Sequence, residues 1–162
     1  MVTEYHFHDR DNFVIQIDYF SIQQLKLQFE ELLQAYRSFH LGRAGTTREE
    51  RDEREELKKR ADLAKHTFKA SFGSRFSEDD GMLLTRSFTD MIGIMVRWAE
   101  EMLPRQQEDR GLATEFESFN SANECSTRLG ALTSEVETGR GQSLWPFIRK
   151  LRLIMSPLNL IA

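Results

Sequence analysis

The sequence predicts an all-α fold, a bundle of about five helices with a short N-terminal β-hairpin or extended arm. Apolar residues recur at steps of three and four over most of the chain, which is the period of a helix that buries one face. Capping residues stand in front of several of these segments. With 162 residues, the chain has the length of one domain and can bury a substantial core. We therefore expect a single helical-bundle domain over residues 1–162.

Composition and charge narrow the class of protein. The chain is 40% apolar and 30% charged with a net charge of −4, which is typical of a folded protein and argues against nucleic acid as a partner. The single cysteine excludes an internal disulfide and suits a reducing compartment. Residues 1–12 lack the pattern of a signal peptide, and no uncharged apolar run reaches the ~18 residues that a membrane-spanning helix needs. We expect a cytoplasmic or nuclear protein.

Residues 1–20 alternate between apolar and polar side chains in two runs, separated by the polar residues 9–12. This period of two, with a polar turn between the runs, predicts a hairpin, and an extended arm is the alternative. An isolated hairpin is marginal in water, so we expect it to lie against helices. The residues expected on shared faces are Tyr5 and Phe7 in the first run, opposite His6 and His8, and Phe13, Ile15, Ile17 and Tyr19 in the second.

Three helices are predicted next, over residues 21–41, 47–72 and 78–103. Each starts after a serine or threonine that is followed by acidic or amide side chains, the usual signal for a helix N-terminus. The first carries a continuous apolar stripe and is followed by Gly42, a residue that suits a helix C-terminus. The third is apolar around most of its circumference, so we expect it in the middle of the bundle.

The last two predicted helices cover residues 112–138 and 143–156. The first has apolar residues at helical spacing, with Cys125 among them. The second, "LWPFIRKLRLIM", tolerates Pro146 because the N–H groups of a first turn have no helical partner. It combines large apolar residues with three basic ones and therefore reads as a basic amphipathic helix.

This last helix supplies the predicted interaction residues, Trp145, Arg149, Lys150 and Arg152. A helix of this kind docks into a groove of a partner or lies on an acidic membrane surface. The sequence favours a terminal core helix whose basic residues face solvent, and docking is the other interpretation.

Few residues suggest chemistry. His6, His8 and Asp9 are candidate metal ligands, but a closed zinc site needs four ligands and no further motif completes the set. Cys125 is a candidate nucleophile, but it falls on an apolar stripe, where a free cysteine packs as a small hydrophobic residue. We expect no catalytic residue, no metal and no cofactor.

A family resemblance rests on "ECSTRLGALTSEVE" followed by "SLWPFIRKLRLIM", over about residues 124–155. This part resembles the closing part of a helical N-terminal domain of fungal proteins. That domain precedes nucleotide-binding signalling modules or ankyrin repeats, and it occurs in small proteins encoded in secondary-metabolite clusters. The resemblance implies a non-enzymatic interaction domain, and no functional residues are carried over from it.

The sequence therefore predicts a non-catalytic protein-interaction or regulatory module, either alone or within a larger signalling or cluster-encoded protein. Its expected partner is another protein or a second copy of the chain. The first alternative is a membrane-surface protein that uses the basic C-terminal helix. The second is a metal-binding or cysteine-dependent enzyme.

Overall fold

Strands and helices are combined in this fold, so the predicted all-α bundle is wrong. The structure, a computed structural model, describes residues 2–7, 11–43, 47–76, 81–103, 114–134 and 143–156. The described residues form two compact units. The sheet unit contains the four strands, a short 3-10 helix (η2) and helix α5, and the helical unit contains the remaining helices. Each unit is described by itself.

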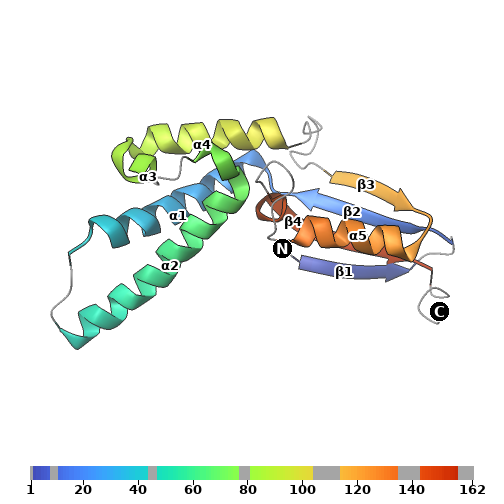
Figure 1. Ribbon diagram of the computed structural model, residues 1–162, viewed down its shortest axis with the longest axis horizontal. Coiled ribbons are helices and arrows are strands. Elements are labelled where there is room, and N and C mark those ends of the chain that lie inside the picture. Colours follow the sequence, from blue (N-terminus) through green and yellow to red (C-terminus); the bar gives the residue numbers. More distant parts are fainter. Residues whose placement is uncertain are drawn as a thin grey trace. The chain divides into compact units, whose positions relative to one another are not determined.

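The sheet unit is a mixed four-stranded sheet in the order β1-β4-β2-β3. Strand β4 runs parallel to β1 and antiparallel to β2, and β2 runs antiparallel to β3 (Figure 1). Strands β1 and β3 therefore form the two edges of the sheet. The strands are β1 (Val2–Phe7), β2 (Phe13–Tyr19), β3 (Thr114–Phe119) and β4 (Ile148–Met155).

The predicted N-terminal hairpin is not present, although both of its strands are. Strand β4 lies between β1 and β2 and pairs with each of them, so that Leu153 is opposite Tyr5 on one side and Ile15 on the other. The expected alternation along β2 does occur, since Ile15, Ile17 and Tyr19 are all buried. A central position for β4 buries more apolar surface than a two-stranded hairpin can, and such hairpins are marginal alone.

The predicted helix over residues 143–156 is wrong as well. The chain forms η2 (Trp145–Phe147) and then β4, the strand that pairs with both β1 and β2. Along β4 the buried residues Leu151, Leu153 and Met155 alternate with more exposed ones. The pairing of β4 with β2 is irregular between Asp18 and Tyr19. Such a bulge inserts an extra residue and disturbs the period of two. The disturbed period is one reason why the sequence pattern of this segment resembles that of a helix.

Residues 112–138, predicted as one helix, contain β3 and α5 (Ala122–Thr133). Ser121 separates them, and its hydroxyl oxygen accepts a hydrogen bond from the backbone N–H of Glu124 at 3.2 Å. This bond satisfies one of the N–H groups that a helix start leaves without a partner. Helix α5 runs along one face of the sheet, and its residues Cys125 and Leu132 are buried (Figure 1).

The helical unit begins with α1 (Ile22–Leu41) and α2 (Arg48–Phe72), which coincide with the predicted ranges 21–41 and 47–72 to within a residue. A capping box fixes the start of α2. The Thr47 hydroxyl accepts from the Glu50 N–H at 3.2 Å, and the Glu50 carboxylate accepts from the Thr47 N–H at 2.9 Å. These bonds satisfy two backbone donors at once. A short 3-10 helix, η1 (Gly73–Arg75), follows α2.

The predicted helix over residues 78–103 is divided into α3 (Gly81–Thr85) and α4 (Phe88–Met102). The Ser87 hydroxyl accepts from the Asp90 N–H at 3.1 Å and so starts a new helix. Arg37 of α1 donates to the carbonyl oxygens of Leu83 at 2.7 Å and Arg86 at 2.6 Å. Carbonyl groups at a helix end lack helical partners, so this arginine stabilises the break.

The core of the helical unit is an aromatic cluster between α1 and α2. Phe29 lies edge-on to Phe68 and Phe72, with ring centroids 6.2 and 5.5 Å apart. Phe72 also contacts Trp98 of α4 at 5.3 Å. Edge-to-face pairs at these separations are stabilising beyond the area they bury. The cluster joins the three long helices of this unit.

Candidate interaction surfaces

The predicted interaction residues lie on η2 and β4 instead of on a helix. Trp145 belongs to η2, and Arg149 lies at the irregular start of β4. Lys150 and Arg152 share one face of the sheet, because they pair with Asp18 and Gln16 of β2 and with Val2 and Glu4 of β1. We call this the charged face. The basic residues are therefore brought together by the pleat of the sheet.

On the charged face, Glu4 is the partner of two basic residues. Its carboxylate accepts hydrogen bonds from Lys150 and from Arg152, the second at 3.1 Å. The hydrogen bond from Lys150, followed by those from His6 and Arg152, lowers the pKa of the Glu4 carboxyl from 4.5 to about 2. Glu4 is consequently ionised at any physiological pH and balances the positive charge beside it.

Asp18 is the buried acidic residue of the same face, with 4% of its surface exposed. One carboxylate oxygen lies 3.1 Å from the Arg152 guanidinium, and the other accepts hydrogen bonds from Gln16 at 3.0 Å and Thr114 at 3.1 Å. Arg149 approaches to 3.9 Å. A buried carboxylate needs such partners because it has lost its water. The three basic residues thus face two acidic ones, and they do not form a patch of one charge.

The opposite face of the sheet is held to α5 by polar contacts. Arg128 of α5 donates two hydrogen bonds to the Glu117 carboxylate of β3, at 2.8 and 2.7 Å. The Tyr19 hydroxyl donates to Glu115 at 2.9 Å, and burial together with this contact raises the pKa of the Tyr19 phenol. Paired, two-point contacts of this kind fix orientation as well as distance. The Arg128–Glu117 pair therefore positions α5 on the sheet, and the Tyr19–Glu115 bond joins β2 to β3.

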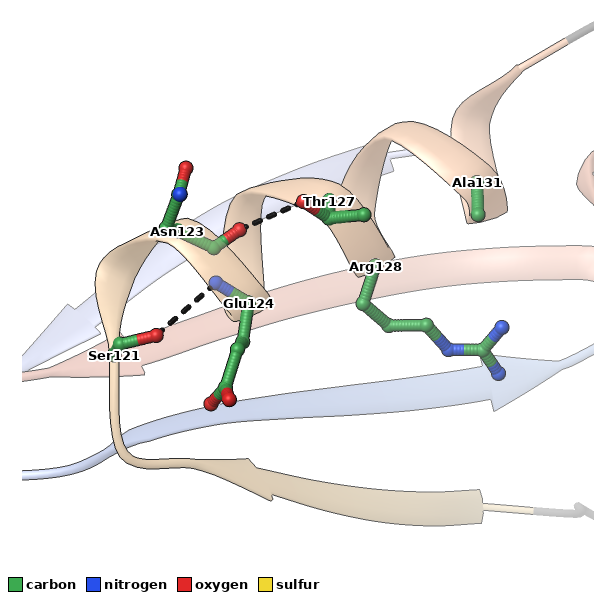
Figure 2. A pocket seen from close by; sticks show the side chains of 6 residues that line it. All are labelled: Ser121, Asn123, Glu124, Thr127, Arg128 and Ala131. Atoms are coloured by element: carbon green, nitrogen blue, oxygen red, sulfur yellow. Dashed lines mark hydrogen bonds between the residues drawn. The ribbon is translucent and has the colours of Figure 1, made fainter.

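A shallow depression of about 600 Å³ lies along α5, from Ser121 to Ala131. Figure 2 shows Glu124 and Arg128 extending toward the strands and Asn123 pointing the other way. The Ser121 hydroxyl caps the helix, and the Thr127 hydroxyl donates to the Asn123 carbonyl at 2.9 Å. Histidine and cysteine are absent among the residues that line it. The two hydroxyl groups that line it, on Ser121 and Thr127, both make hydrogen bonds with the backbone of α5.

The helical unit has a groove of about 280 Å³ between α1 and α4. Phe88, Ile92 and Val96 provide its apolar floor, and Gly93 has open space where a side chain would be. Lys26 and Glu30 lie on its rim. The groove is a further apolar surface.

The most exposed apolar surface of the sheet unit is the edge strand β1. Val2, Tyr5 and Phe7 have 56%, 65% and 56% of their surfaces exposed. Among the described strands, β1 pairs with β4 alone and lies at the end of the strand order. Its sequence, VTEYHF, contains none of the lysine, proline or glycine that often protect an edge strand. We call this surface the β1 edge.

Sequence reasoning missed the β1 edge because it assigned Tyr5 and Phe7 to a hairpin packed on helices. The alternation of the side chains was read correctly, since Tyr5 and Phe7 share a face with Leu153 and Met155. What the sequence did not reveal is that this strand lies at an edge. The lack of lysine, proline and glycine in VTEYHF was the available signal.

The candidate metal ligands are only partly described. His6 lies on β1, and its ring nitrogen is 3.3 Å from the Glu4 carboxylate. His8 and Asp9 lie outside the described residues. Within the ranges that the structure describes, no three histidine, cysteine, aspartate or glutamate side chains gather as a metal site requires.

The candidate nucleophile, Cys125, is 2% exposed on α5. Burial raises the pKa of its thiol. The thiolate is the reactive form, so a raised pKa and a closed surface both reduce reactivity. The position is that of a packing residue.

We expect Cys125 in the native protein to resist thiol-modifying reagents at neutral pH and to react fully after denaturation. Because the pKa of the thiol is raised, the thiolate forms at a higher pH than in a free cysteine. The small amount of native labelling should therefore begin to increase only at a higher pH than labelling of a free cysteine does. Labelling followed by mass spectrometry on native and urea-unfolded protein measures this. Native labelling at the unfolded rate would show that the thiol is accessible.

The membrane alternative relied on a basic amphipathic helix, and the segment concerned is a strand. In the part of the chain that the structure describes, no helix is both long and apolar enough to cross a bilayer.

Comparison with protein-family models, with curated proteins and with solved structures found no match to this chain.

Proposed function

We propose that this protein is a non-catalytic protein-interaction module that binds an extended segment of a protein partner along the β1 edge. The observation that carries the proposal is the exposure of Val2, Tyr5 and Phe7 on an edge strand. An edge strand presents backbone N–H and C=O groups that a partner strand can pair with, and exposed side chains at alternate positions add affinity.

The other surfaces support this choice by their chemistry. The polar groups of the charged face bind one another, with Asp18 and Glu4 each contacting Arg152. The depression along α5 is lined by groups that cap or brace the helix. Large apolar side chains that remain exposed are the usual mark of an interaction site.

Absence of catalysis is part of the proposal and has its own support. The nucleophile candidate Cys125 is buried, and its pKa is raised where a catalytic thiol needs it lowered. The sequence resemblance over residues 124–155 implies the same class of function. We propose the cytoplasm or nucleus as its location, as the composition predicts.

The test places a photoactivatable phenylalanine analogue at position 5 of the full chain, and at position 116 in a matched control. Tyr5 and Phe116 are both aromatic, lie on opposite edge strands and are each 65% exposed. Irradiation in an extract of the source cells should give a discrete adduct from position 5 and only background from position 116. Excess wild-type chain should compete the adduct away, whereas excess Tyr5→Lys chain should not.

Equal labelling from the two positions would contradict the proposal, as would an adduct that the Tyr5→Lys chain also competes away. Mass spectrometry of the adduct identifies the partner and separates a second copy of this chain from a different protein.

A further inference from the structure

We infer that the partner at the β1 edge is a second copy of this chain, paired antiparallel through β1 with Tyr5 of one copy opposite Tyr5 of the other. This inference rests on the proposed function and adds to it the identity and the register of the partner. It would continue the four-stranded sheet across a two-fold axis into a sheet of both copies.

The pleat restricts the registers that such a pairing can adopt. A two-fold axis normal to the sheet keeps each face continuous, and residues directly opposite each other project from the same face. For a strand of six residues, two registers of this kind pair five residues of each copy. In one of them Glu4 is opposite Glu4, and in the other Tyr5 is opposite Tyr5.

Charge complementarity selects between these registers. With Glu4 opposite Glu4, like charges would face each other directly, which is destabilising. With Tyr5 opposite Tyr5, Glu4 of each copy is opposite His6 of the other, so each carboxylate faces an imidazole ring, which can donate a hydrogen bond to it. The Glu4 register opposes two carboxylates and the Tyr5 register does not, and this favours the Tyr5 register.

The Tyr5 register also covers the apolar side chains that β1 exposes. Tyr5 would pack on its own copy across the axis, and Phe7 would lie opposite Thr3. Tyr5 and Phe7 share a face with the buried residues Leu153 and Met155 of β4. Pairing would therefore extend the buried apolar surface of the sheet, and aromatic cross-strand pairs are among the stabilising ones.

The opposite edge strand, β3, is protected against the same pairing. With Phe116 opposite Phe116 across a two-fold axis, Glu115 would face Glu117 of the other copy twice. With Glu117 opposite Glu117, like charges again meet directly. Both glutamates lie on the face that α5 covers, bound to Tyr19 and Arg128. Both of these β3 registers oppose acidic side chains, whereas the Tyr5 register of β1 does not, and the two edges differ in this respect.

The first measurement is the mass of the full-length protein in solution by sedimentation equilibrium over a range of concentrations. The wild-type chain should approach twice its 19.0 kDa mass at high concentration. Tyr5→Lys places like charges opposite each other and should raise the dissociation constant about ten-fold or more. Phe116→Lys, which is matched in residue type and exposure, should leave it unchanged within about two-fold.

The second measurement tests the register by oxidation of single cysteine variants. Opposite residues of an antiparallel pair have Cα atoms about 4.5–5.5 Å apart, which a disulfide can bridge. Tyr5→Cys should therefore form a covalent dimer much faster than Glu4→Cys or Phe116→Cys. The native Cys125 is buried and provides the background rate. Dominant cross-linking of Glu4→Cys would overturn the register.

Weak dimers are populated at about 0.2 mM protein. If the wild-type protein still has the mass of a single chain at that concentration, the inference is overturned. The proposed function would survive that result if the adduct from position 5 contained a different protein and still required Tyr5. Loss of both the dimer and the adduct would overturn both. Since Tyr5 is exposed, Tyr5→Lys should melt like the wild type at a concentration where both chains are monomeric, and a thermal melt at that concentration checks this.

Discussion

Replacing Phe72 with alanine is expected to lower the free energy of unfolding by about 3–5 kcal/mol, as truncation of a large buried aromatic residue usually does. Phe72 is fully buried, with 0% of its surface exposed. Its ring lies 5.5 Å from Phe29, 5.9 Å from Phe76 and 5.3 Å from Trp98. Alanine would remove these contacts and leave a cavity that α1, α2 and α4 cannot close without moving.

Urea unfolding followed by circular dichroism at 222 nm measures the effect, because the helical signal reports on the unit that contains Phe72. Leu27→Ala is the matched control. Leu27 lies on α1 with 61% of its surface exposed, so its truncation should change the free energy of unfolding by less than about 0.5 kcal/mol. Equal midpoints for the two variants would mean that Phe72 is not at the centre of the core.

Replacing Arg152 with methionine is expected to lower the free energy of unfolding by about 2–4 kcal/mol, the range for breaking a buried charge pair, reduced for partial exposure. The guanidinium of Arg152 lies 3.1 Å from the Asp18 carboxylate. The Arg152 side chain is 27% exposed, and the Asp18 side chain is 6% exposed. Methionine keeps much of the apolar stem but leaves the Asp18 carboxylate with less positive charge near it. Most of the loss comes from this carboxylate, which water does not reach.

A double-mutant cycle isolates the effect. Asp18→Asn removes the charge at that site, so the double variant Asp18→Asn/Arg152→Met should be more stable than additivity of the single variants predicts. Lys150→Met is the control on the same face, because the ion pair of Lys150 is with Glu4, whose side chain is 35% exposed, and this change should have little effect. Simple additivity of the two single variants would show that Asp18 and Arg152 are not coupled.

Two helices of the helical unit, α1 and α2, follow from local sequence. Thr47 and Glu50 lie three residues apart and form the capping box that starts α2. The apolar stripe of α1, with Leu25, Phe29 and Leu33 at helical spacing, is the buried face of that helix. Both signals act within one or two turns of the chain, so they can be read without knowledge of the rest of the fold. The alternation along β2 is local in the same way.

Two predicted helices, over residues 112–138 and 143–156, are wrong because the spacing of their apolar residues fits both a helix and a strand. Phe116 and Phe119 are three residues apart, as on a helix, yet the strand β3 places them on opposite faces. In β4, the bulge near Arg149 shifts the alternation so that Ile148 and Leu151 are both buried. Short apolar runs do not distinguish a helix from a buried strand by period alone.

The candidate site depended on the tertiary structure for a similar reason. The sequence singled out Arg149, Lys150 and Arg152 as a basic cluster, but their partners Glu4 and Asp18 are more than a hundred residues away in the chain. Only the insertion of β4 between β1 and β2 brings these groups together and balances their charges. Local sequence therefore determined α1, α2 and the faces of β1 and β2. Strand order, which depends on the burial of apolar surface between distant segments, decided that β4 is a strand, that its basic residues are paired and that β1 remains an open edge.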